Sequence, residues 1–477
     1  MGYQVFANLI EGAHVSGPAK PNVNPSDVSD TIGEFVQGDA AQVSSAIAAA
    51  RNAFPAWSRV SPQVRSDVLD RAAETILARR EELGRLLSRE EGKTLAEGIG
   101  EVVRAGQIFK FFAGEALRLT GDLVASVRPG IDVEVSHEPV GVVGLITPWN
   151  FPIAIPAWKL APALAYGNCA VIKPAELTPG CAHALVSILW EAGAPVGVVN
   201  LVMGRGSVVG NALVESPGVD AISFTGSVPT GRGIAARCME LGKRVQCEMG
   251  GKNPLVVLDD ADLDVAVNVA INGSFYSTGQ RCTASSRLIV SDSVHDAFVD
   301  KLSKAMLDLK VGHAIDSESQ IGPVVDDKQL TQDLDYIQIA RDEGAEVIGG
   351  SRLNRPTEGF FLQPALLVGT TQTMRVNREE IFGPVASVIR VHDDDEAVAV
   401  ANDTEFGLSA GVCTTSLSRT RRFKRDLEAG MVMVNLPTAG VDYHVPFGGR
   451  KGSSIGPREQ GSYARQFYTV VKTTYVG

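Results

Sequence analysis

Short apolar segments alternate with helix-length segments along most of this chain. Residues 141–146 and 170–173 are apolar runs separated by a helix-length segment at 155–166, and the apolar run at 198–202 follows a further helix-length segment. Apolar strands joined through helices pack side by side in one parallel sheet, which helices cover on both faces. The alternation therefore predicts an α/β fold with a doubly wound parallel sheet.

The same alternation begins again at residue 253 and continues to residue 447, with apolar runs at 254–258 and 430–435. A chain of 477 residues is longer than one hydrophobic core normally serves. The second stretch therefore predicts a second α/β domain. A cleft between two such domains is a common place for a ligand.

The remaining segments carry different patterns. Residues 41–118 have apolar positions at three- and four-residue spacing, which predicts amphipathic helices. Residues 131–138 alternate polar and apolar side chains, as an exposed strand does, and residues 466–473 are rich in β-favouring side chains. We expect these two strands to present sheet edges that a partner must cover.

Composition and charge exclude several classes of function. Charged residues make up 21% and apolar residues 44% of the chain, and no apolar run is long enough to span a membrane. The net charge of −11 argues against nucleic-acid binding, which needs a basic surface. The N-terminus lacks the pattern of a secretory signal, and the six cysteines lack metal-binding or disulfide spacing. We therefore expect a soluble, cytoplasmic protein that holds no metal.

Two short blocks carry reactive side chains. Glu248 lies in the block CEMGGKNP at 247–254, at the end of an apolar run, and Cys282 lies in the block GQRCT at 279–283, among small or polar residues. A carboxylate can serve as a general base and a cysteine as a nucleophile. The pair indicates thiolate chemistry, with a buried structural cysteine and a strand-capping glutamate as the alternative.

Two further blocks accompany these, TPWNFP at 147–152 and EEIFGPV at 379–385. The four blocks stand in the order found in the aldehyde dehydrogenase superfamily, which the chain resembles from residue 54 to residue 451. The resemblance implies a homodimer or homotetramer of the family's fold. Its expected parts are a Rossmann-like dinucleotide-binding domain (1–118 and 139–249), an α/β catalytic domain (250–449) and a small β oligomerisation element (119–138 and 450–477).

The resemblance also implies a role for each reactive residue. Cys282 would attack an aldehyde, Asn150 would donate a hydrogen bond to the oxyanion, and Glu248 would activate water against the resulting thioester. Arg281, next to the cysteine, would favour the thiolate. Family members that transfer the acyl group to coenzyme A tend to lack this glutamate, so Glu248 favours hydrolysis to a free acid.

The resemblance implies a nicotinamide dinucleotide as cofactor, although the glycines at 204, 206 and 210 do not fit the G-x-G-x-x-G spacing. A strand that turns into a helix at 222–228 offers a helix N-terminus to one phosphate. Glu176 would bind the adenosine ribose and repel a 2′-phosphate, which favours NAD, while Lys173 leaves NADP open. The expected contacts are Ile146, Trp149, Lys173, Glu176, Gly206, Gly226, Ser227, Glu380 and Phe382.

Residues 435–454 resemble the branch of the family that oxidises 2,5-dioxopentanoate, also called α-ketoglutaric semialdehyde. Arg104 would bind the carboxylate of such a substrate, and Arg281 is a second candidate. The other expected substrate contacts are Phe151, Trp158, Thr283 and Phe447. A dehydrogenase for neutral aldehydes, a cysteine acyl hydrolase without a redox step, and a non-catalytic scaffold remain the alternatives.

Overall fold

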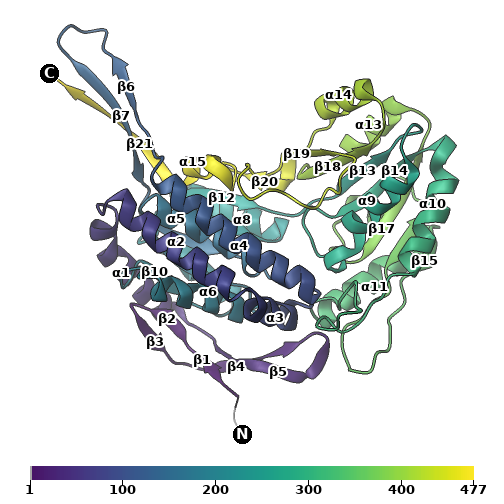
Figure 1. The fold of residues 1–477 in the computed structure, drawn as a ribbon, viewed down its shortest axis with the longest axis horizontal. Helices are drawn as coiled ribbons and strands as arrows, with labels where there is room; N and C mark the ends of the chain where they lie inside the picture. The colour runs from purple at the N-terminus through teal and green to yellow at the C-terminus, as the bar shows by residue number, and fades with distance from the viewer. Residues whose placement is uncertain (1–2) are drawn as a thin grey trace.

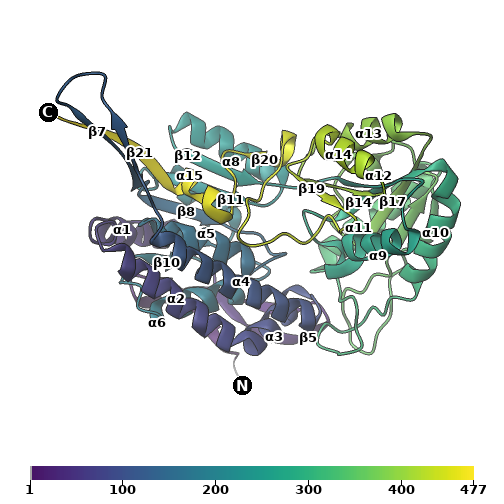
Figure 2. The same ribbon diagram turned by 45° about the horizontal axis from the view of Figure 1, so that its top comes forward.

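The computed structural model describes residues 3–477 and contains two α/β domains, with a long β-hairpin projecting from the first (Figure 1). The strands of the second domain's sheet lie between Asn253 and Val434. After the last of these strands, the C-terminal segment returns across the first domain (Figure 2). No helix within residues 3–477 is both long and apolar enough to cross a membrane.

The first domain is built on an eight-stranded sheet in the order β20-β12-β11-β8-β9-β10-β2-β3. Its five central strands are parallel, and β8, β9 and β11 are buried along their whole length because helices cover both faces. The strands are β2 (Asn8–Ile10), β3 (Ala13–Val15), β8 (Val142–Ile146), β9 (Cys169–Lys173), β10 (Val199–Leu201), β11 (Ala221–Thr225), β12 (Arg244–Glu248) and β20 (Ser454–Ile455).

The helices of this domain confirm the helical pattern predicted over residues 41–118. Helix α4 begins with a capping box, in which Thr94 and Glu97 each accept a hydrogen bond from the other's backbone N–H. The helices are α1 (Ala40–Trp57), α2 (Pro62–Ala78), α3 (Arg80–Glu91), α4 (Leu95–Ala116), α5 (Ala154–Ala165), α6 (Pro179–Glu191), α7 (Asn211–Glu215) and α8 (Val228–Glu240).

The second domain has a seven-stranded sheet in the order β15-β16-β17-β14-β13-β18-β19. All neighbouring strands are parallel except β15 and β16, so the second predicted α/β unit is confirmed. The strands are β13 (Asn253–Val257), β14 (Ser285–Ser291), β15 (Glu346–Gly349), β16 (Ala365–Val368), β17 (Val385–Val391), β18 (Ser409–Cys413) and β19 (Met431–Val434). The helices are α9 (Leu263–Phe275), α10 (Asp292–Leu307), α11 (Asp327–Asp342), α12 (Arg375–Arg378), α13 (Asp394–Asn402) and α14 (Leu417–Asp426).

The projecting hairpin consists of β6 (Asp122–Ala125) and β7 (Asp132–Pro139), and the C-terminal strand β21 (Thr469–Val476) adds to β7 (Figure 1). The strand expected over 466–473 begins only at Thr469, because residues 465–468 form the helical turn α15 (Arg465–Tyr468). Phe467 and Tyr468 are buried in the core of the first domain, and this packing outweighs their β propensity. Strand β20 likewise pairs with β12, so residues 454–468 pack on the first domain and not on the hairpin.

Three strands from the N-terminal part of the chain form a small separate sheet, in the order β1-β5-β4. Its strands are β1 (Val5–Phe6), β4 (Ala19–Asn24) and β5 (Asp27–Val36). The assignment of the three parts of the chain as dinucleotide-binding domain, catalytic domain and oligomerisation element remains a prediction.

Candidate active site

Cys282 lies on a short loop between the single turn Tyr276–Gly279 and strand β14. Ser277 and Thr278 have φ of 51° and 55°, a left-handed conformation that non-glycine residues rarely adopt. Gly279 continues this run with φ of 64°, and a Cβ atom there would come within 2.1 Å of the Gly383 carbonyl oxygen. Cys282 therefore follows a strained and closely packed turn.

Two cavities meet at Cys282, which lines both. The larger has a volume of about 720 Å³ and the smaller about 360 Å³. The other five cysteines, all within the described residues, are buried, whereas Cys282 is half-buried. Cys282 is therefore the cysteine that a small molecule entering from either side can reach.

Burial raises the pKa of the Cys282 thiol to about 12, and the carboxylates of Glu380 and Glu248 add to the rise. The expectation that Arg281 favours the thiolate is therefore wrong. Its guanidinium is directed to Glu97 at 3.2 Å, to the Ser277 hydroxyl at 2.9 Å and to the Asn272 carbonyl. The thiol needs a base that removes its proton.

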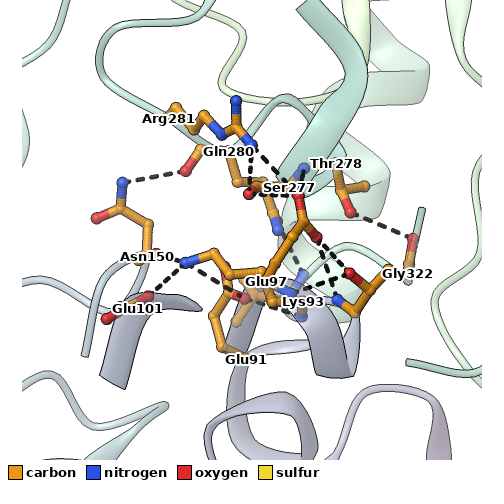
Figure 3. A network of polar contacts seen from close by, with 12 residues as sticks. Glu91, Lys93, Glu97, Glu101, Asn150, Ser277, Thr278, Gln280, Arg281 and Gly322 are labelled. Carbon is orange, nitrogen blue, oxygen red and sulfur yellow. Dashed lines mark hydrogen bonds and ion pairs between the residues drawn. The ribbon is translucent and has the colours of Figure 1, made fainter. Parts of the chain in front are cut away.

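Asn150 follows β8 and is buried at the wall of the larger cavity. Its side-chain amide donates a hydrogen bond to the Gln280 carbonyl at 3.0 Å, two residues before the cysteine (Figure 3). The amide N–H groups of Asn150 thus face the loop that carries Cys282. This is the placement that an oxyanion donor requires.

Glu248 ends strand β12 and is 1% exposed. Its Oε2 accepts a hydrogen bond from the Ser454 hydroxyl at 2.6 Å, while its Oε1 has no hydrogen-bond partner. Burial and then the Glu459 carboxylate raise the pKa of Glu248 well above its usual range. The next two residues, Met249 and Gly250, line the larger cavity, whereas Glu248 itself lines neither cavity.

Five of the expected cofactor residues line the larger cavity: Trp149, Gly226, Ser227, Glu380 and Phe382. Ser227 is the N-cap residue of α8, so the positive end of this helix faces the cavity. Glu380 accepts a hydrogen bond from Gly251 N–H at 2.9 Å, and burial raises its pKa to about 7. The Trp149 and Phe382 rings pack edge to face with centroids 5.4 Å apart.

The other four expected cofactor residues lie beside this cavity. Glu176 accepts a hydrogen bond from Gly206 N–H at 3.3 Å, and Leu177, the residue after Glu176, lines the cavity. Lys173 ends β9, and burial lowers its pKa to about 8. Ile146 ends the neighbouring strand β8 and is 7% exposed. These residues lie at the carboxyl ends of the central strands, where α/β sheets bind ligands.

All six expected substrate residues line the smaller cavity: Arg104, Phe151, Trp158, Arg281, Thr283 and Phe447. The two arginines differ in their partners. Arg281 is paired with Glu97, whereas Arg104 has no carboxylate at ion-pair distance anywhere in residues 3–477. Arg104 donates one long hydrogen bond, 3.5 Å, to the Gln460 side chain, and its Nε is buried without a partner.

Several polar residues that support the site were not predicted from the sequence. Lys93, Glu97 and Glu101 connect the two halves of the site, as Figure 3 shows, and Ser454 holds Glu248. In the sequence these residues resemble an ordinary charged helix face or loop, because their contacts lie far away along the chain. The capping-box spacing of Thr94 and Glu97 indicates the start of a helix but not these contacts.

Comparisons with known proteins agree with this geometry. The sequence profile of the Aldehyde dehydrogenase family matches residues 14–474. The α-ketoglutaric semialdehyde dehydrogenase of Bacillus subtilis is 42% identical, over 99% of this chain and 98% of that protein. The 2,5-dioxopentanoate dehydrogenase of Saccharolobus solfataricus is 40% identical, over 97% of each chain.

Solved structures show the same fold. The betaine aldehyde dehydrogenase of Staphylococcus aureus in complex with NAD⁺ superimposes with a TM-score of 0.96 at 33% identity, over 98% of this chain and 94% of that one. An NADP-dependent enzyme of Escherichia coli superimposes with a TM-score of 0.96 at 37% identity, over 100% and 98% of the two chains. The chain therefore belongs to the aldehyde dehydrogenase family, whose members are enzymes that oxidise aldehydes with NAD or NADP.

Proposed function

We propose that this enzyme oxidises 2,5-dioxopentanoate, or a similar short aldehyde ending in a carboxylate, to the free acid. The unpaired guanidinium of Arg104 in the smaller cavity is the observation that carries the proposal. A partly buried cation without a carboxylate partner is unfavourable unless a ligand supplies the anion. The names of the relatives from B. subtilis and S. solfataricus support the same substrate.

In the proposed first half-reaction, the substrate lies in the smaller cavity with its aldehyde carbon at Cys282. The sulfur bonds to this carbon as the thiol proton leaves to solvent water in the cavity, and the oxyanion of the thiohemiacetal accepts hydrogen bonds from Asn150 Nδ2 and Cys282 N–H. Low-dielectric surroundings strengthen such hydrogen bonds. Loss of a hydride from the carbon then leaves a thioester on Cys282.

In the second half-reaction, Glu248 removes a proton from water, which attacks the thioester carbon. The bond between this carbon and sulfur then breaks, Glu248 returns the proton to the Cys282 sulfur, and the free acid leaves. The free Oε1 of Glu248 can accept the water's hydrogen bond, while Ser454 fixes the other oxygen. The raised pKa makes the Glu248 carboxylate a stronger base. The carbonyl oxygen stays beside Asn150 in both half-reactions.

The larger cavity fits a dinucleotide. Its volume of about 720 Å³ suits a ligand of that size, the N-terminus of α8 can bind a phosphate, and the Glu380 carboxylate can accept hydrogen bonds from ribose hydroxyls. When bound, the nicotinamide would accept the hydride from the substrate carbon. Phe382 and Trp149 would keep water away from that end of the cavity.

We further propose NAD as the preferred cofactor. Glu176 is exposed beside Gly206 and can accept hydrogen bonds from both hydroxyls of the adenosine ribose, while its charge would repel a 2′-phosphate. Lys173 would contact the same ribose. Because Lys173 can offset only part of this repulsion, we expect the enzyme to use NADP, but with slower turnover than with NAD.

Assembly into a homodimer or homotetramer in the cytoplasm completes the proposal. The hairpin and β21 extend from the first domain and carry exposed apolar side chains, for example Leu123 at 79% and Val471 at 62% exposure. Exposed apolar strands of this kind favour pairing with a second subunit.

A panel of aldehydes with and without a terminal carboxylate, assayed with NAD and NADP in parallel, tests the function. The proposal expects 2,5-dioxopentanoate to exceed pentanal in kcat/KM, and NAD to exceed NADP. Equal kcat/KM values for the two aldehydes would leave a dehydrogenase for neutral aldehydes. Release of an acid from an ester or thioester without any reduction of NAD or NADP by aldehydes would indicate an acyl hydrolase.

A further inference from the structure

The carboxylate of Glu97, on the first turn of α4, supports the strained loop that carries the cysteine. Its Oε1 accepts hydrogen bonds from Ser277 N–H at 2.8 Å, from the Ser277 hydroxyl at 3.0 Å and from the Arg281 guanidinium at 3.2 Å (Figure 3). These contacts fall on the residue where the left-handed run begins and on the residue next to Cys282. One carboxylate thus holds the loop on both sides of its strained segment.

The ammonium group of Lys93 supports the opposite side of the site. It donates to the Asn150 carbonyl oxygen at 2.5 Å and to Glu101 Oε2 at 2.8 Å, and its side chain is only 1% exposed (Figure 3). The other oxygen of Glu101 accepts from the N–H groups of Ile153 and Ala154, each at 3.0 Å. Lys93 and Glu101 therefore fix the backbone of the segment that carries Asn150.

The charge state of Lys93 suits this contact. Burial lowers the pKa of Lys93, but Glu101 and Glu91 outweigh burial, so the pKa is raised overall. Burial raises the pKa of Glu91 to about 8, so Glu101 is the main carboxylate partner at neutral pH. A cation so well paired is not free to bind a substrate anion, although it lines the smaller cavity.

We propose that Lys93 and Glu97 are positioning residues that set Asn150 and Cys282 in register for the attack on the aldehyde. They lie four residues apart in sequence, yet one contacts the segment of the oxyanion donor and the other contacts the loop of the nucleophile. This inference rests on the proposed roles of Asn150 and Cys282. It adds that residues at the start of α4 contact both the Asn150 segment of the first domain and the Cys282 loop of the second.

The two residues should differ in what they affect. Lys93 acts on Asn150, which matters when an oxyanion forms but not when the thiol reacts with an alkylating reagent. Glu97 acts on the loop itself, so its loss should also lower the fraction of time in which the Cys282 thiol faces the cavity. Misplacement of a reacting group by 1 Å can cost on the order of 100-fold in rate.

The test compares the rate of the first turnover, followed as reduced cofactor, with the rate of alkylation by iodoacetamide. Cys282 is the half-buried cysteine among the described residues, so alkylation reports on it. Lys93→Met should slow the first turnover by about 10- to 100-fold with alkylation unchanged. Glu97→Gln should slow both. The dissociation constant of NAD and the KM for aldehyde should change little in either variant.

Lys110→Met and Glu115→Gln, exposed or surface-paired positions on the same helix, serve as matched controls and should retain wild-type rates. If Lys93→Met does not fold, the double variant Lys93→Met with Glu101→Gln removes both charges and should show the same slow first turnover. Lys93→Arg, which keeps a charged donor, should recover part of the rate.

Equal slowing of turnover and alkylation by Lys93→Met would overturn the inference, since it would indicate a general disturbance of the structure. A first turnover within about twofold of wild type in either variant would also overturn it. Failure of the wild-type enzyme to reduce NAD or NADP with any aldehyde would instead refute the proposed function. In that case the proposed role of Lys93 in the reaction is refuted as well. Unchanged alkylation in Glu97→Gln would then refute the proposal that Glu97 supports the Cys282 loop.

Discussion

Arg281 donates a hydrogen bond to the Glu97 carboxylate at 3.2 Å, although both side chains line the cavity proposed for the substrate. This pairing offsets the charge of the arginine next to Cys282. Arg104, on the same cavity, has no such partner within the described chain. The two arginines that the sequence offered as carboxylate ligands are therefore not equivalent, and Arg104 is the one available to a substrate.

Arg104→Ala should lower kcat/KM for 2,5-dioxopentanoate by about 10- to 100-fold, mainly through KM, because an ionic hydrogen bond of about 1.5–3 kcal/mol is lost. Pentanal should react at the wild-type rate. Steady-state kinetics with both aldehydes check this. Arg118→Ala, at an exposed position at the end of the same helix, is the control and should alter neither rate. A loss that is equal for both aldehydes would remove Arg104 from carboxylate recognition.

Asn150→Ala should slow the first turnover by about 100- to 1,000-fold, the usual cost of removing one oxyanion donor. Binding of NAD should persist, since Asn150 is not among the residues expected to hold the dinucleotide. Rapid mixing of enzyme, NAD and aldehyde, with absorbance of the reduced cofactor as readout, measures the effect. A decrease of less than about tenfold would favour a purely structural asparagine before Pro152.

Glu248→Gln should increase stability, and the increase should grow with pH. The carboxyl group has its usual pKa of 4.5 when unfolded and a raised pKa when folded, so the folded state binds the proton more tightly. The wild-type protein therefore loses stability as pH rises from 4.5 toward the folded pKa, and glutamine does not titrate. Melting temperatures of both proteins at pH 5 and pH 8 test this. A difference that shrinks with rising pH would contradict the raised pKa.

Removal of residues 469–477 should reduce the size of the assembly, because it removes β21 and leaves unpaired the edge of β7 to which β21 is hydrogen-bonded. Sedimentation of the full chain should give a dimer or a tetramer of a 50.5 kDa subunit, and the truncated chain a smaller species. Far-ultraviolet circular dichroism confirms that the truncated chain is folded. An active monomer from the full chain would contradict the proposed assembly.

The sequence predicted the two parallel sheets because their strands are short apolar runs separated by helices, a local pattern that long-range packing does not change. It failed at Gln466–Tyr468, which are β-favouring but form a helical turn, since Phe467 and Tyr468 are drawn into the core of the first domain. The N-terminal strands β1 to β5 were also not predicted. Strands β1, β2 and β3 are only two or three residues long, and β4 and β5 contain Pro, Asn, Asp and Gly, which are uncommon in strands.

The candidate reactive residues could be selected because each lies in a short block with an unusual composition. Asn150 and the loop that carries Cys282 are joined in the structure through the Gln280 carbonyl. The electrostatics were not predictable. Arg281 is next to Cys282 in sequence but points to Glu97, and burial raises the cysteine pKa. The contacts of Lys93 and Ser454 in the site are with partners 57 and 206 residues away. Such contacts leave no mark in the local sequence.

The most direct test of the account is a single-turnover experiment on Glu248→Gln with 2,5-dioxopentanoate and NAD, with Cys282→Ala as the control. We predict one rapid equivalent of reduced cofactor per subunit and then a stall. The mass spectrum should show the acyl group attached to the peptide that contains Cys282. Cys282→Ala should bind NAD but give no burst. Steady turnover by Glu248→Gln at the wild-type rate, with no acylated peptide, would contradict the assignment of Glu248 as the base that hydrolyses a Cys282 thioester.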